Sequence, residues 1–139
     1  MSQQNIAVLT LTVIASETIS ACRAVDFDGA AIAAQGGKAM GIAMSAATSG
    51  AALAVVTHGT AVAETGAAIT RGQALIADAQ GRVIPATSGL HIAAGAIPVT
   101  STAANGAILE GGDPPEFILG DALQPAAGAG DFIEILLRR

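Results

Sequence analysis

Residues 6–14 read Ile-Ala-Val-Leu-Thr-Leu-Thr-Val-Ile, and this stretch indicates the fold class. Its leucines alternate with threonines, and a period of two residues with β-branched side chains is typical of a strand. The polar residues 1–5 precede it. We therefore expect residues 1–14 to form an N-terminal arm that is partly mobile until bound, followed by a single β-rich domain over residues 15–139.

Glycine punctuates the rest of the chain. The 17 glycines in 139 residues have a mean spacing of about eight, which is typical of short strands joined by turns. Five glycines fall in the alanine-rich region 29–50, which disfavours a long helix there and leaves room for one or two helical turns around 30–35. The pattern predicts a mainly β fold, a small barrel or sandwich, with further strands at 21–27, 52–58, 61–64, 73–77, 82–85, 107–110, 116–119 and 131–137.

The last of these strands has two distinct faces. Alternation puts Phe132 and Glu134 on one face and Ile133, Ile135 and Leu137 on the other. We expect it to be a core strand.

The hydrophobic content of the chain, 52% of its residues, consists largely of small side chains. Alanine supplies 33 of those residues, and the aromatic residues are three phenylalanines. Because burial stabilises by about 25 cal/mol per Å² of apolar surface, an alanine-rich core stabilises weakly per residue. Such a protein gains much stability when it buries further surface against its own copies or against a partner.

Charge and cysteine content exclude several classes of function. Six basic and eleven acidic residues give a net charge of −5, which argues against nucleic-acid binding. The apolar stretch 6–15 is half the length of a membrane span and lacks a positive flank, so we expect neither a transmembrane helix nor a targeting signal. The single cysteine, Cys22, excludes an internal disulfide and a thiolate metal cage.

The polar residues do not form a recognisable catalytic or metal-binding pattern. His58 and His91 lack partners at metal-ligand spacing, and Asp113, Glu116 and Asp121 do not fit a calcium loop. The segment 36–41, Gly-Gly-Lys-Ala-Met-Gly, lacks the glycine and hydroxyl residues of a phosphate-binding loop, and no serine lies in a G-x-S-x-G elbow. We expect no catalytic residues, no cofactor, no metal and no small-molecule substrate.

Several segments nevertheless resemble a known family. They are Val-Asp-Phe-Asp-Gly at 25–29, His-Gly-Thr-Ala-Val-Ala-Glu-Thr-Gly-Ala-Ala-Ile at 58–69 running on to Gly72, Asp-Ala-Gln-Gly-Arg at 78–82, and Gly-Asp-Ala-Leu at 120–123 followed by Gly-Asp-Phe-Ile-Glu-Ile-Leu-Leu at 130–137. In these patterns the chain resembles the capsid cement, or head decoration, proteins of tailed bacteriophages over nearly its whole length. Residues 84–116 are longer than the compact family pattern.

The resemblance implies a structural protein on the outer face of the expanded icosahedral head. Relatives commonly sit as trimers at three-fold and quasi-three-fold junctions and bridge capsid subunits against internal DNA pressure. The implied partners are the major capsid protein and further copies of the chain, and the implied location is the capsid exterior, after assembly in the host cytoplasm.

The N-terminal arm is the candidate binding element, because an extended apolar segment can pair with an edge strand of the capsid or of an adjacent subunit. The candidate capsid- or subunit-binding residues are Ile6, Val8, Leu9, Thr10, Leu11, Thr12 and Val13. The alternatives are a tail-tube or spike component, or a β-sandwich binding module. A left-handed β-helix acyltransferase is disfavoured because its six-residue period breaks after Gly81.

Overall fold

The computed structural model describes residues 3–86 and 116–138, and all regular secondary structure in these two ranges is β-strand. The mainly β fold predicted from the sequence is confirmed. The strands are β1 (Ala7–Ile14), β2 (Ala24–Val25), β3 (Gly41–Ala43), β4 (Ala52–Glu64), β5 (Ala74–Ala77), β6 (Val83–Pro85), β7 (Gly120–Ala122) and β8 (Phe132–Leu137).

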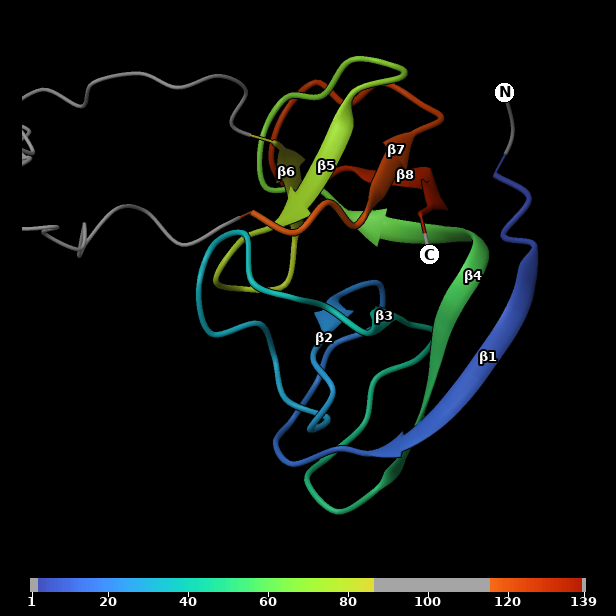
Figure 1. Ribbon diagram of the computed structural model, residues 1–139, viewed down its shortest axis with the longest axis vertical. Helices are drawn as coiled ribbons and strands as arrows, with labels where there is room; N and C mark the ends of the chain where they lie inside the picture. Colours follow the sequence, from blue (N-terminus) through green and yellow to red (C-terminus); the bar gives the residue numbers. More distant parts are fainter. Residues whose placement is uncertain (1–2, 87–115, 139) are drawn as a thin grey trace, which may run out of the picture.

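The long strand β4 connects the two halves of the molecule (Figure 1). Its first half is flanked by β1 and β3, since Val55 and Val56 each have one partner in β1 and another in β3. Its second half pairs antiparallel with β8, from Gly59 to Glu64. One strand thus joins the two halves of a single eight-stranded sheet.

The second half of β4 starts a small, nearly closed barrel. The hydrogen-bonded order runs β4, β8, β7, β5 and β6, with antiparallel pairing throughout. The sheet returns to its start because Thr65, the residue after β4, forms a bridge with Val83 of β6. The backbone N–H of Gly66 donates to the Val83 carbonyl at 2.8 Å. Closure leaves few unpaired strand edges in this half.

Two hydrophobic clusters fill the fold. The larger one includes Leu75, Val83 and Ile135 of the barrel, all fully buried, and it extends to β2, β3 and the first half of β4. The smaller one lies under the first half of β4 and includes Leu53 and Val55. Aliphatic side chains of modest size make up both clusters.

The strand predictions differ from the structure at four places. The two strands expected at 52–58 and 61–64 are one strand, because β4 continues through Gly59 in a left-handed conformation, with φ at 99°. The strand expected at 116–119 is wrong, since β7 begins at Gly120. Strand β3 was not predicted, and only Ala24–Val25 of the strand expected at 21–27 is regular. The strand expected at 107–110 lies outside the described residues.

Candidate interaction surface

The residues predicted to bind a partner lie on β1 and just before it. Strand β1 runs antiparallel along β4, from Ala7 opposite Gly59 to Ile14 opposite Ala52. Among the described residues, β4 is the only strand that pairs with β1. In Figure 1 the other edge of β1 faces outward at the right margin of the molecule. The structure therefore brings the predicted residues together on one edge strand.

Strand β1 exposes large apolar side chains on both of its faces. Val8 is 76% exposed, and Leu11 and Ile14, which point to opposite faces, are 44% and 58% exposed. Val13 and Ala7 are half-buried and pack against the two clusters. No charged residue occurs in residues 6–14. Natural edge strands are usually protected by charges, prolines or bulges. Strand β1 has a register irregularity around Leu9 but neither a charge nor a proline, and an exposed apolar strand of this kind is typical of a binding surface.

Glycine at position 59 allows β1 to lie this close to β4. A Cβ atom at Gly59 would lie 2.3 Å from the carbonyl oxygen of Ile6 and 2.7 Å from the backbone nitrogen of Val8. The pairing register shifts at this point, around Leu9. Any other residue at position 59 would push the beginning of β1 away from β4.

A buried carboxylate holds the residues that precede β1. Glu134 of β8 is 2% exposed, although it lies on the outer face of its strand. Its oxygens accept hydrogen bonds from the backbone N–H groups of Gln4 at 2.9 Å and Asn5 at 2.8 Å, and from the hydroxyl of Thr60 at 2.6 Å. The same Thr60 hydroxyl oxygen accepts from the N–H of Ile6 at 2.8 Å. We call Glu134 and Thr60 the N-terminal clip.

The clip depends on backbone shape and on charge. Asn5 has a φ of 50°, a left-handed conformation that asparagine tolerates, and it directs two successive N–H groups at one anion. Burial pushes the pKa of Glu134 upward, but the hydrogen bonds from Thr60, Gln4 and Asn5 outweigh it and lower that pKa below its ordinary value. The carboxylate is thus held in its charged form while it binds the N-terminal residues.

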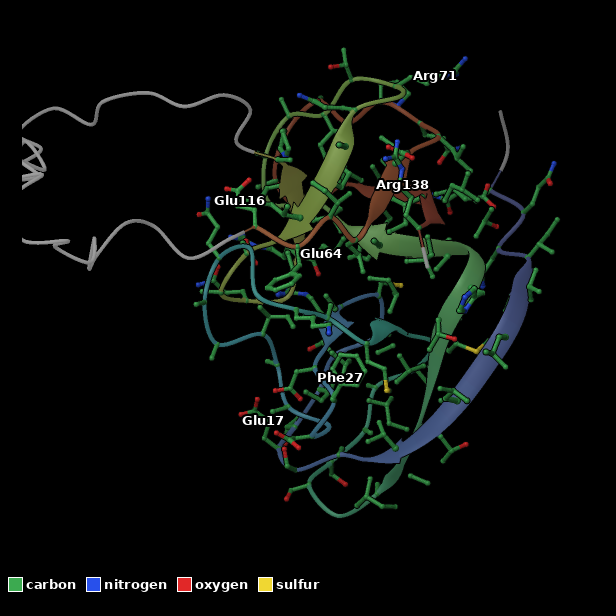
Figure 2. All side chains as sticks on the ribbon, in the orientation of Figure 1. Glu17, Phe27, Glu64, Arg71, Glu116 and Arg138 are labelled. Atoms are coloured by element: carbon green, nitrogen blue, oxygen red, sulfur yellow. The ribbon has the colours of Figure 1, made fainter. Side chains whose placement is uncertain are left out.

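A second exposed apolar group is formed by residues outside β1. The ammonium nitrogen of Lys38 lies 5.6 Å from the ring centroid of Phe27 and 5.8 Å from that of Phe117, which is cation–π distance. Phe27 is 52% exposed and Phe117 is 42% exposed. We call Phe27, Lys38 and Phe117 the aromatic patch. Figure 2 labels Phe27 in the lower half and Glu116 near the left margin, whereas β1 forms the right margin.

Sequence reasoning missed the clip and the patch for different reasons. The polar Glu134 between two isoleucines was a visible signal, but alternation assigned it to the same face as exposed Phe132. The patch joins residues at positions 27, 38 and 117, and no local pattern connects such distant positions.

Other polar groups offer little chemistry. Burial, and then the charge of Glu64, raise the pKa of the Cys22 thiol and disfavour a reactive thiolate. A surface pocket beside Ile84 has Asp78 and Arg82 as its charged lining residues, and these two are paired at 2.7 Å. Within residues 3–86 and 116–138 no group of three metal-ligating side chains occurs. In the same ranges no helix is long and apolar enough to cross a membrane. His91 lies outside the described residues.

Comparison with known proteins decides the family. A model of the phage cement protein family matches residues 2–138, nearly the entire chain. The chain belongs to the phage cement protein family. This confirms the resemblance seen in the sequence and identifies a class of phage structural proteins rather than a class of enzymes. Family membership supports a structural role associated with the phage head, as a component of the virion.

A solved structure confirms the fold of this cement protein. The chain is similar to the head fiber gp8.5 N base of bacteriophage phi29, with a TM-score of 0.59 at 15% sequence identity. The similarity covers 94% of this chain and 93% of that one. No curated protein sequence matches the chain.

Proposed function

We propose that the protein binds the outer surface of the expanded phage head, as trimers at three-fold and quasi-three-fold junctions, and stabilises the head against internal DNA pressure. Family membership supports association with the capsid. The observation that carries the proposal further is β1, an uncharged strand with exposed apolar side chains and an outward-facing edge.

Strand β1 is suited to a contact with a capsid edge strand or with an adjacent subunit. Its backbone groups supply hydrogen bonds along the open edge, and side chains such as Val8 and Leu11 supply apolar area on either face. Because the strand has no charge, its burial in a contact requires no charge to be desolvated.

Trimerisation would multiply this contact. One strand of eight residues offers a small area, and interfaces below about 1,000 Å² are usually weak. Three linked copies bind with an avidity that can exceed the single affinity by about a hundredfold or more. Because the residues before β1 are held by the clip in the free chain, each strand is also ordered in advance, which lowers the entropy cost of binding.

The test is co-sedimentation of the purified protein with expanded heads and with unexpanded procapsids of its phage, with copies per particle counted. Saturable binding to expanded heads alone, at a multiple of three per junction, is the expected result. Val8→Glu should lose binding, because a charge would enter the contact, while Ala68→Glu, an exposed control in the loop between β4 and β5, should bind like the wild type.

A substitution is a cleaner test than truncation. Deleting residues 1–14 would remove β1, which pairs with β4 along most of the first half of β4, and would therefore damage the fold itself. Equal binding of Val8→Glu and wild type would exclude β1 as the contact. No binding of the folded wild type to either particle would overturn the proposal in favour of a tail component or a binding module.

A further inference from the structure

Backbone groups of alternate residues in β1 point away from β4. The N–H of Ala15, directly after β1, donates to the Ala51 carbonyl at 2.9 Å, which continues the β1–β4 register. Paired residues of antiparallel strands alternate between hydrogen-bonded and non-hydrogen-bonded positions. Thr10, Thr12 and Ile14 therefore occupy the non-hydrogen-bonded positions, and their backbone N–H and carbonyl groups point toward the outer edge of β1.

The turn that carries Gly29 ends the free part of this edge. The N–H of Ser16, the next outward-pointing group after Ile14, donates to the Gly29 carbonyl at 3.0 Å. A Cβ atom at Gly29 would lie 2.2 Å from the carbonyl oxygen of Ile14, so Gly29 lies against that oxygen. The chain itself thus already pairs with the outer edge beyond Ile14, in the direction that the alternation requires.

The register irregularity around Leu9 ends the free edge on the other side. The Leu9 carbonyl accepts a hydrogen bond from the Thr57 hydroxyl of β4 at 3.2 Å, so it points inward. Between the two ends, the free edge offers the N–H groups of Thr10, Thr12 and Ile14 and the carbonyls of Thr10 and Thr12. These groups form a short window in which one further strand can pair in regular register.

Two exposed carboxylates lie beside the Ile14 end of this window. Glu17 directly follows Ser16, and Asp28 directly precedes Gly29. Within the described ranges neither carboxylate forms an ion pair. A partner strand that carries a lysine or arginine at this end would match their charge. A second copy of β1 brings no such group, because the first basic residue of the chain is Arg23, which is paired with Glu64 at 2.8 Å.

We propose that an extended strand of the capsid surface pairs with Thr10, Thr12 and Ile14 through its backbone, and that a basic side chain at its end meets Glu17 and Asp28. The inference rests on the proposed function, and it names the backbone groups and the partner chemistry of that contact. The pairing of β1 with β4 is unchanged by it, because the outward-pointing groups are not bonded to β4.

Side chains next to the window restrict the partner further. Leu11 and Val13 lie on one face of β1, and Thr10, Thr12 and Ile14 lie on the other. None of them is charged, so a charged side chain directly opposite would lose its water without gaining an ionic partner. The partner strand should therefore be uncharged where it pairs, with apolar or threonine side chains opposite those of β1.

A proline substitution tests the backbone pairing. Thr12→Pro removes one outward N–H, and proline is accepted in an edge strand where its N–H would face solvent, so the variant should fold. Its binding to expanded heads should weaken by about tenfold or more, because the partner loses a hydrogen bond and meets the proline ring. Thr12→Val keeps the N–H and should bind like the wild type. Val13→Pro removes an N–H that faces β4 and should destabilise the fold instead. Equal head binding by Thr12→Pro and the wild type would overturn the proposal.

Residue-resolved hydrogen exchange tests the same pairing without a substitution. In the free chain the amides of Thr12 and Ile14 should exchange fast and those of Leu11 and Val13 slowly, because only the latter two face β4. On saturated heads the exchange of Thr12 and Ile14 should slow by about tenfold or more. Unchanged exchange of these two amides on heads would overturn the pairing. Their protection in the concentrated free protein would assign the edge to a second copy and overturn the capsid partner.

The basic end of the partner is tested by removing the two carboxylates. Glu17→Gln with Asp28→Asn should weaken head binding at low salt by about two- to fivefold for each carboxylate, and should make binding less dependent on salt. Glutamine retains an oxygen that can accept the N–H of Ala31, as Glu17 does at 2.7 Å. Binding of the double variant equal to that of the wild type at low salt would contradict a basic partner side chain at this end.

Failure of the proposed function is distinguishable from failure of the strand pairing. If the folded wild type binds no heads, the proposed function is wrong, and the capsid partner is excluded with it. If the wild type binds heads and Val8→Glu does not, while Thr12→Pro binds normally, the side chains of β1 carry the capsid contact. In that case the proposed function stands and the backbone pairing alone is wrong.

Discussion

Strands β1 and β8 lie along opposite edges of β4 where all three meet at Gly59, and they differ sharply in burial. Both sequences are rich in Ile, Leu and Val. Strand β8 buries Ile133 and Ile135 inside the barrel, whereas β1 leaves most of its side chains in solvent. Apolar content therefore does not distinguish a core strand from a binding strand. The distinction comes from whether the sheet around the strand closes.

The two strands are also connected chemically. Outward-facing Glu134 of β8 would be solvated in an ordinary barrel, but here the residues before β1 cover it. Glu134 of the core strand β8 thus holds the residues before β1 and fixes the position of the exposed surface on β1. The following predictions separate the contribution of β8 to stability from that of β1.

The largest effect is expected in the core. Ile135→Ala should lower the free energy of unfolding by about 2–5 kcal/mol, because Ile135 is fully buried and its loss leaves a cavity. Chemical denaturation of the monomer measures this. Leu11→Ala on β1 is the matched control and should cost less than about 1 kcal/mol, since Leu11 is 44% exposed. Equal costs for the two substitutions would mean that β1 is as buried as β8 in solution.

The clip should give the next largest effect. Glu134→Gln keeps the shape of the side chain but turns one acceptor oxygen into an NH₂ group facing a donor, so it should cost about 1–3 kcal/mol. Hydrogen exchange should show faster exchange at the amides of Gln4, Asn5 and Ile6. Glu64→Gln, which weakens a partly exposed ion pair with Arg23, should cost no more than about 1 kcal/mol and leave those amides protected.

The contribution of the clip to the free energy of unfolding should also depend on pH, and it should fall at low pH. Because the pKa of Glu134 is lowered in the folded state, the charged form contributes stability above the unfolded pKa of about 4.3. That contribution is lost as the pH falls through the folded pKa, which lies lower. The stability difference between wild type and Glu134→Gln should therefore be constant near neutral pH and shrink below about pH 4. A difference that stays constant to pH 3 would show that charge plays no part in the clip.

Much of this architecture could be predicted from local pattern. Alternation and glycine spacing gave the strand content, and the C-terminal strand was correctly expected to be a core strand, since Ile133, Ile135 and Leu137 are buried. Contacts between distant residues could not be predicted in this way. The burial of Glu134 depends on residues 4 and 5, and the left-handed Gly59 that keeps β4 continuous looks like a turn when it is considered alone.

The smallest effect on the free chain should come from the outermost side chain of β1. Val8 is 76% exposed, so Val8→Ser removes little area that folding buries, and the free energy of unfolding of the monomer should stay within about 0.5 kcal/mol of the wild type. Denaturation at low protein concentration measures this. Ile133→Ser is the matched comparison on β8, where a hydroxyl would enter the barrel core and cost several-fold more. A large loss for Val8→Ser in the monomer would mean that the free chain already covers this residue, and β1 would then be a structural strand with no surface to offer a partner.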